Sequence, residues 1–116
     1  MPIPNAASAF IPPTKLSGCL LNLAHPVGGP KARWFIALDY QPDNPDQLET
    51  DLLEIVRNSS DYVDEQTAFG VKYVVRGQVE SPTGSLANVC TVWITETNGP
   101  QPRLVTVYPD ENRINE

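Results

Sequence analysis

The sequence is poor in the residues on which several classes of small protein depend. Its 116 residues include two cysteines and one histidine. These are too few for a disulfide scaffold or a zinc site. No apolar run approaches the roughly 18 residues of a membrane-spanning helix, and residues 1–10 lack the basic start of a signal peptide. We therefore expect a cytoplasmic protein with no metal, no cofactor and no membrane contact, in which Cys19 and Cys90 are reduced and buried.

Positive charge is also scarce, and the negative charge is concentrated in one stretch. The chain carries 14 acids and 8 bases, a net charge of −6, but residues 39–65 hold nine acids and one base, which makes −8 there and +2 elsewhere. This balance excludes a broad basic surface for nucleic acid and still permits a local site for one phosphate. The acidic stretch is either a solvated helix face or a contact for a basic partner.

Proline and apolar periodicity together predict an α+β domain. Prolines crowd residues 2–13, which favours an extended or loosely ordered segment over residues 1–15, whereas residues 46–81 contain none. Apolar spacing then predicts two N-terminal helices, packed on one face of a four-stranded antiparallel meander. The first expected helix spans 30–38, and the second begins after a cap at Asn44 or Asp46 and ends near Asn58. The expected strands span 61–67, 71–78, 89–95 and 103–108. The domain would cover residues 16–109, followed by a polar tail at 110–116.

A loop before the first predicted helix carries the first candidate chemistry. His25 is the side chain best suited to proton transfer near neutral pH. Asn22 precedes it, and Gly28, Gly29 and Lys31 follow it at the expected helix start. Glycine lets the backbone approach a ligand, and the N–H groups of a helix start favour an anion. His25 is thus either a catalytic or ligand-binding residue, or a residue that orders the loop.

The second candidate site is the face of the sheet turned away from the helices. Strand alternation places the apolar Cys90, Val92 and Ile94 toward the helices. The opposite face would then offer cations, hydroxyls and an aromatic surface suited to a phosphoryl group and an unstacked base. Its expected members are Lys72, Arg76, Thr91, Trp93, Thr106 and Tyr108, with Arg103 at the rim. An ordinary solvated sheet face remains the alternative.

Four ordered motifs carry a family resemblance over Leu16 to Pro109. They are Asn22-x-x-His25-Pro-x-Gly-Gly-x-Lys31-Ala, Phe69-Gly-x-Lys72-Tyr, Thr91-Val-Trp-Ile and Arg103-Leu-Val-Thr-x-Tyr108-Pro. In these the chain resembles a bacterial domain family of unknown function, number 6883, whose members occur alone or at the end of larger chains that resemble secreted toxins. The order of helices and strands is also similar to the barnase, EndoU, colicin and RelE type of ribonuclease fold, an analogy at the level of the fold.

The resemblance implies a toxin-type domain that cleaves a phosphodiester. His25 would be its acid or base, Lys31 and Arg103 would hold the phosphate, and Thr91 would donate a hydrogen bond. Tyr108 would share proton transfer or stack a base, and the second proton carrier would be Tyr108 or Lys31. RNA or a nucleotide would then be bound at a local site.

Two other functions remain open. One is a non-catalytic module that binds a cognate protein, with the site residues held in internal hydrogen bonds. The other is a small-ligand pocket lined by Trp34, Phe35 and Trp93.

Overall fold

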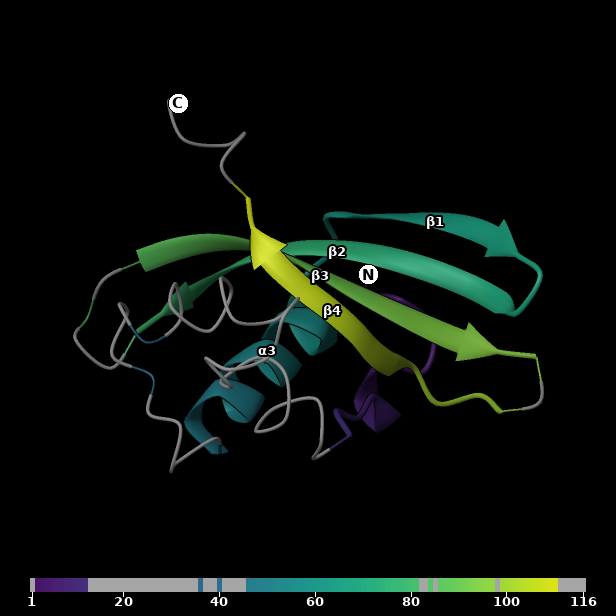
Figure 1. Cartoon of the computed structure of the whole chain (residues 1–116), viewed down its shortest axis with the longest axis horizontal. Helices are drawn as coiled ribbons and strands as arrows, with labels where there is room; N and C mark the ends of the chain where they lie inside the picture. The colour runs from purple at the N-terminus through teal and green to yellow at the C-terminus, as the bar shows by residue number, and fades with distance from the viewer. Residues whose placement is uncertain are drawn as a thin grey trace.

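One helix packed on a four-stranded sheet makes up most of the described structure. The computed structural model describes residues 2–12, 36, 40, 46–81, 84, 86–97 and 99–110. Its elements are η1 (Ala6–Ser8), α3 (Asp46–Asn58), β1 (Tyr62–Thr67), β2 (Gly70–Glu80), β3 (Leu86–Glu96) and β4 (Arg103–Pro109). Figure 1 shows α3 and η1 on the same side of the sheet. The described residues contain one α-helix where two were predicted, because the helix expected at 30–38 lies outside them except for Ile36.

The amphipathic pattern predicted α3 and its end near Asn58, and the structure begins the helix at Asp46, one of the two residues considered as its cap. Its four buried side chains are Leu48, Leu52, Ile55 and Val56. Asp46 and Glu49 in the first turn and Arg57 in the last turn complement the helix dipole. Burial of each large aliphatic side chain contributes about 1.5–3 kcal/mol, so the apolar side of α3 holds the helix on the sheet. No helix among the described residues is long and apolar enough to cross a membrane.

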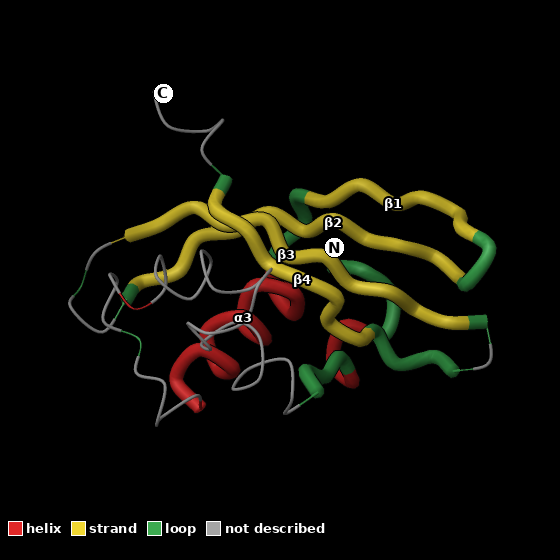
Figure 2. The backbone as a smooth tube through the Cα atoms, viewed as in Figure 1, coloured by secondary structure: helices red, strands yellow, loops and turns green. Residues whose placement is uncertain are grey.

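The sheet is the antiparallel meander that the turn signals predicted. Its order is β1-β2-β3-β4, and every neighbouring pair is antiparallel, as Figure 2 shows. β1 and β2 are joined by a two-residue turn, in which the Thr67 hydroxyl donates to the Gly70 carbonyl at 2.8 Å. β2 and β3 pair from Gly70↔Glu96 to Glu80↔Leu86. That register decides which side chains face α3.

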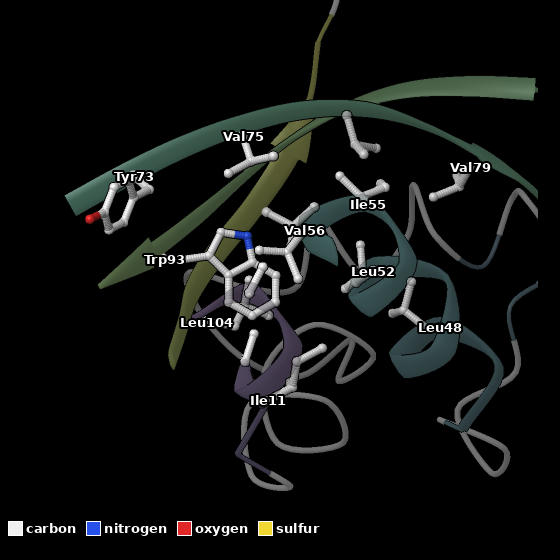
Figure 3. Packing of buried hydrophobic residues seen from close by; sticks show 14 of the residues in the cluster. Ile11, Leu48, Leu52, Ile55, Val56, Tyr73, Val75, Val79, Trp93 and Leu104 are labelled. Carbon is white, nitrogen blue, oxygen red and sulfur yellow. The ribbon is translucent and has the colours of Figure 1, made fainter. Parts of the chain in front are cut away.

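The faces of β3 are the reverse of the prediction. Tyr73, Val75 and Val79 of β2 face α3, and the register places Trp93 opposite Tyr73 and Thr91 opposite Val75. Trp93 and Thr91 are therefore fully buried, and Figure 3 shows the Trp93 ring beside Val56 and Leu104. Cys90, Val92 and Ile94 lie on the opposite face. A shift of one residue in pairing turns every side chain of a strand over, so this register is what reverses the faces.

An irregularity between β3 and β4 sets the faces of the last strand. The register shifts between Val92 and Trp93, which leaves Val105 of β4 without a partner of its own. Leu104 and Val107 consequently both enter the core, although strict alternation would separate them. The same shift places Arg103 on the face that carries Thr106 and Tyr108.

Gly77 allows the close approach of β2 to α3. A Cβ atom at this position would lie 2.6 Å from Cγ2 of Ile55. Such a distance is too short for carbon atoms, so only glycine fits here without movement of the helix. At Gly77, the backbone of β2 therefore packs directly against the side chain of Ile55 in α3.

The first segment is more ordered than its prolines indicate. Ile3, Ala6, Ala9 and Ile11 are buried in the same core as α3 and the sheet. Phe10 forms a parallel bridge with Arg103. Residues 2–12 thus pack against the domain and complete the core beside β4.

Candidate functional site on the open sheet face

The face of the sheet turned away from α3, here called the open face, gathers polar side chains from all four strands. Paired residues of an antiparallel sheet lie on the same face. One line across the sheet runs through Arg76, Cys90 and Tyr108, and another runs through Glu65, Lys72, Ile94 and Arg103. Between them lie Val63, Val74, Val92 and Thr106. The predicted cluster of Lys72, Arg76, Arg103, Thr106 and Tyr108 therefore does share one face.

Arg76 lies between two carboxylates of different exposure. Its Nη1 is 3.5 Å from Oδ1 of Asp61, and its Nε is 4.0 Å from Oδ2 of Asp110. The Asp61 side chain is 52% exposed, whereas that of Asp110 is 5% exposed. Asp110 is also fixed through its backbone N–H, which donates to the Asn88 carbonyl at 2.9 Å. The buried carboxylate thus positions the guanidinium, and the exposed one can be displaced.

Tyr108 and Cys90 are cross-strand partners on the open face, and Cys90 is also paired with Arg76 on its other side. Burial raises the pKa of the Tyr108 hydroxyl, and its interaction with Cys90 raises it further, while Arg76 lowers it. Burial also raises the pKa of the Cys90 thiol, with a further increase from the Asp110 carboxylate. Both groups therefore keep their protons near neutral pH. Tyr108 is a proton or hydrogen-bond donor, and Cys90 is not an activated nucleophile.

The other cations of the open face are paired with exposed carboxylates. Lys72 Nζ lies 3.5 Å from Glu65 Oε1, and Arg103 Nη2 lies 3.1 Å from Glu96 Oε2. Each of these four side chains is more than a third exposed. Exposed ion pairs contribute only about 0–1 kcal/mol, so an anionic ligand can compete with Glu65 or Glu96 for either cation.

Thr91 and Trp93 do not belong to this face. Trp93 Nε1 donates to Thr91 Oγ1 at 2.7 Å, and the Thr91 hydroxyl donates to the Val75 carbonyl at 2.9 Å. Both side chains are fully buried. They form an internal hydrogen-bond chain under the sheet, and this placement corrects the prediction that they face a ligand.

The candidate loop lies outside the described residues. This applies to Asn22, His25, Gly28, Gly29 and Lys31, and equally to Cys19 and to Trp34 and Phe35 of the expected pocket. Their roles stay predictions. Within the described residues no group of three or more His, Cys, Asp or Glu is arranged to hold a metal ion.

Sequence reasoning missed the two carboxylates beside Arg76. Asp110 was assigned to the polar tail and Asp61 to the acidic stretch around α3, because each is far from Arg76 in sequence. The position of Asp61 could have been predicted from the sequence, because a two-residue turn after Thr67 places Asp61 opposite Arg76. A cleft of about 300 Å³ lies at this point, lined by Ser59, Asp61, Arg76, Gly77, Gln78 and Asn88.

Comparison with known proteins identifies the family. The model of the domain of unknown function DUF6883 matches residues 2–111. The chain belongs to this DUF6883 family. The match includes the first segment, which contributes Ile3, Ala6, Ala9 and Ile11 to the core. No curated protein matches the sequence.

A solved structure shares the fold of this DUF6883 domain. It is a chain of the contact-dependent growth inhibition toxin–immunity protein complex from Klebsiella pneumoniae 342. The two chains superpose with a TM-score of 0.68 at 14% sequence identity, over 90% of this chain and 96% of that chain. At this identity the likeness shows a common fold.

Proposed function

We propose that this DUF6883 domain is a toxin-type ribonuclease, which cleaves a phosphodiester on the open face. The observation that carries the proposal is the line Arg76, Cys90 and Tyr108 across the open face, which places a cation and a protonated hydroxyl on either side of β3. The fold likeness to a chain of a toxin–immunity protein complex supports a part in a system of that kind.

The reaction needs a base, an acid and a cation around one phosphate. In the proposed step the 2′-oxygen of the RNA attacks phosphorus and forms a bond to it, while the bond from phosphorus to the 5′-oxygen breaks. His25 takes the proton of the 2′-hydroxyl, and Tyr108 gives its proton to the leaving 5′-oxygen. The products are a 2′,3′-cyclic phosphate and a 5′-hydroxyl. Arg76 stabilises both the extra charge on the phosphate and the tyrosinate left behind.

Asp61 and Asp110 have different parts in this proposal. The exposed pair of Asp61 with Arg76 opens when phosphate arrives, because such a pair contributes only about 0–1 kcal/mol. Asp110 stays buried and holds the guanidinium in place. Lys72 and Arg103, at the other line of the open face, contact neighbouring phosphates of the strand, and Lys31 assists His25.

Two tyrosine-to-phenylalanine variants test the proposal, one at the proposed site and one as its control. Tyr108→Phe removes the hydroxyl from the open face, and Tyr62→Phe removes one from the helix-facing side of β1. Cleavage of total RNA, followed by analysis of the product ends, should slow by about 100-fold or more in Tyr108→Phe. His25→Ala should lose cleavage as well, whereas Tyr62→Phe should match the wild type. Absence of cyclic phosphate ends in the wild-type reaction, or equal rates in the two tyrosine variants, contradicts the proposal.

A second function, a protein-binding module without catalysis, is favoured by a different observation. All three cations on the described open face are paired with carboxylates, and Thr91 is committed to internal hydrogen bonds. On this alternative the wild type and His25→Ala would both leave RNA intact. The same cleavage assay therefore separates the two functions.

A further inference from the structure

The two edges of the sheet differ in how their backbone groups are used. At the β4 edge, Phe10 accepts a hydrogen bond from the Leu104 N–H at 3.1 Å and donates to the Pro102 carbonyl at 3.0 Å. In the described part of the chain, β1 pairs with β2 on one side and with no strand on the other. Figure 2 shows β1 as the outermost strand. Among the described residues the β4 edge is thus partly covered, and no strand covers the β1 edge.

The hydrogen-bond pattern shows which groups of β1 point outward. The Arg76 N–H donates to the Asp61 carbonyl at 2.9 Å. Alternation in an antiparallel ladder then directs the backbone groups of Val63, Glu65 and Thr67 toward β2. The N–H and C=O groups of Tyr62, Asp64 and Gln66 consequently point away from the sheet, spaced to pair with one further strand.

The side chains of this edge indicate which strand fits. On the open face, β1 and the residue before it present Asp61, Val63 and Glu65 in alternation, and Val63 is 53% exposed. Residues 61–67 contain three acids and no base. A second copy of β1 would bring carboxylates against carboxylates, which is unfavourable between directly opposite residues. A strand that alternates basic, apolar and basic side chains matches the same positions in charge and hydrophobicity.

A second apolar contact lies at the end of the same hairpin. Phe69 in the β1–β2 turn is 73% exposed, the highest exposure among the large apolar side chains of the described residues. It stands at the end of the edge where an added strand would continue past Thr67. Protein ligands that extend a sheet combine main-chain hydrogen bonds with pockets or contacts for alternate side chains, and Val63 and Phe69 are suited to such contacts.

We infer that the outer edge of β1 binds an extended basic segment of a partner protein as a fifth, antiparallel strand. Its backbone pairs with Tyr62, Asp64 and Gln66, and its basic side chains lie opposite Asp61 and Glu65. An apolar side chain between them covers Val63. This surface includes Asp61, the exposed ion-pair partner of Arg76, but neither Arg76 nor Tyr108.

A defined peptide pair tests this edge. The probe is the peptide Thr-Lys-Thr-Val-Thr-Lys-Thr, and its control carries glutamate at both lysine positions. Titration of the labelled full chain, followed by amide NMR, should show binding of the basic peptide only. Hydrogen exchange should slow at the amides of residues 62, 64 and 66. Equal binding of both peptides, no binding, or protection at β4 instead overturns the inference.

A substitution at Gln66 separates backbone pairing from attraction between charges. Gln66→Pro removes an outward N–H without breaking a bond to β2, and Gln66→Ala is the matched control. Loss of one hydrogen bond should weaken binding of the basic peptide about five-fold in Gln66→Pro, and Gln66→Ala should stay within about two-fold of the wild type. Equal affinities in both variants contradict strand addition. If Gln66→Pro lowers stability in urea, the exchange pattern of the wild type decides the question by itself.

Discussion

The buried hydroxyl of Thr91 provides the sharpest test of the fold. This hydroxyl accepts the indole N–H of Trp93 and donates to the Val75 carbonyl, with no exposure to water. Thr91→Val keeps the shape of the side chain and removes both hydrogen bonds. The indole N–H is then buried without a partner, which costs about 1–3 kcal/mol, and the added methyl group offsets part of this by up to about 0.8 kcal/mol. We expect a net loss of about 2 kcal/mol.

Thr95 supplies a matched control on the same strand and the same face. Its Oγ1 is buried and has no hydrogen-bond partner among the described residues. Thr95→Val therefore removes a desolvated hydroxyl and loses no hydrogen bond. Its stability should stay equal to the wild type or rise by up to about 1 kcal/mol. The same chemical change should thus have opposite consequences at two positions four residues apart on one face of β3.

Urea unfolding followed by tryptophan fluorescence measures both variants. With an m-value of about 1–2 kcal/mol per M, the midpoint of Thr91→Val should fall by about 1–2 M, while that of Thr95→Val should not fall. Equal midpoints for the two variants, or a stable Thr91→Val, would refute the hydrogen-bond chain under the sheet. Such a result would return Thr91 to the open face, where the sequence alone placed it.

Three further predictions concern packing and protonation. Gly77→Ala should lower the free energy of unfolding by about 1–3 kcal/mol, because its Cβ meets Cγ2 and Cγ1 of Ile55, and urea unfolding should show a smaller loss when it is made in an Ile55→Ala background, which lacks those two atoms. Burial raises the pKa of the Tyr40 and Tyr73 hydroxyls above that of the unfolded chain. The contribution of these two groups to the free energy of unfolding should therefore be constant below about pH 9 and fall as the pH rises past about 10. Tyr40→Phe, which also removes the 2.5 Å hydrogen bond to Asp51, should flatten that fall, and an unchanged slope would contradict it. In a Cys19→Ser background, Cys90 should react slowly with a thiol reagent until urea unfolds the chain, since the thiol is buried.

Local patterns in the sequence determined the elements of this domain. The apolar spacing of Leu48, Leu52, Ile55 and Val56 and the early acids predicted α3 and its end near Asn58, since amphipathic periodicity is a property of one segment. The four strands and their order followed from turn residues between runs rich in valine and tyrosine. The family resemblance, carried by four motifs, also followed from the sequence and is confirmed by the match over residues 2–111.

The composition of the open face was decided only by the tertiary structure. Alternation divides β3 into two sets, but the pairing of β3 with β2 determines which set meets α3. The buried Trp93–Thr91 hydrogen bond makes a polar pair compatible with the core, which apolarity alone could not reveal. In the same way, Asp61, Arg76 and Asp110 come from distant parts of the chain, and only the pairing of the strands brings them together. Local sequence determines that side chains alternate along each strand, whereas the register between strands determines which of the two sets faces the helix.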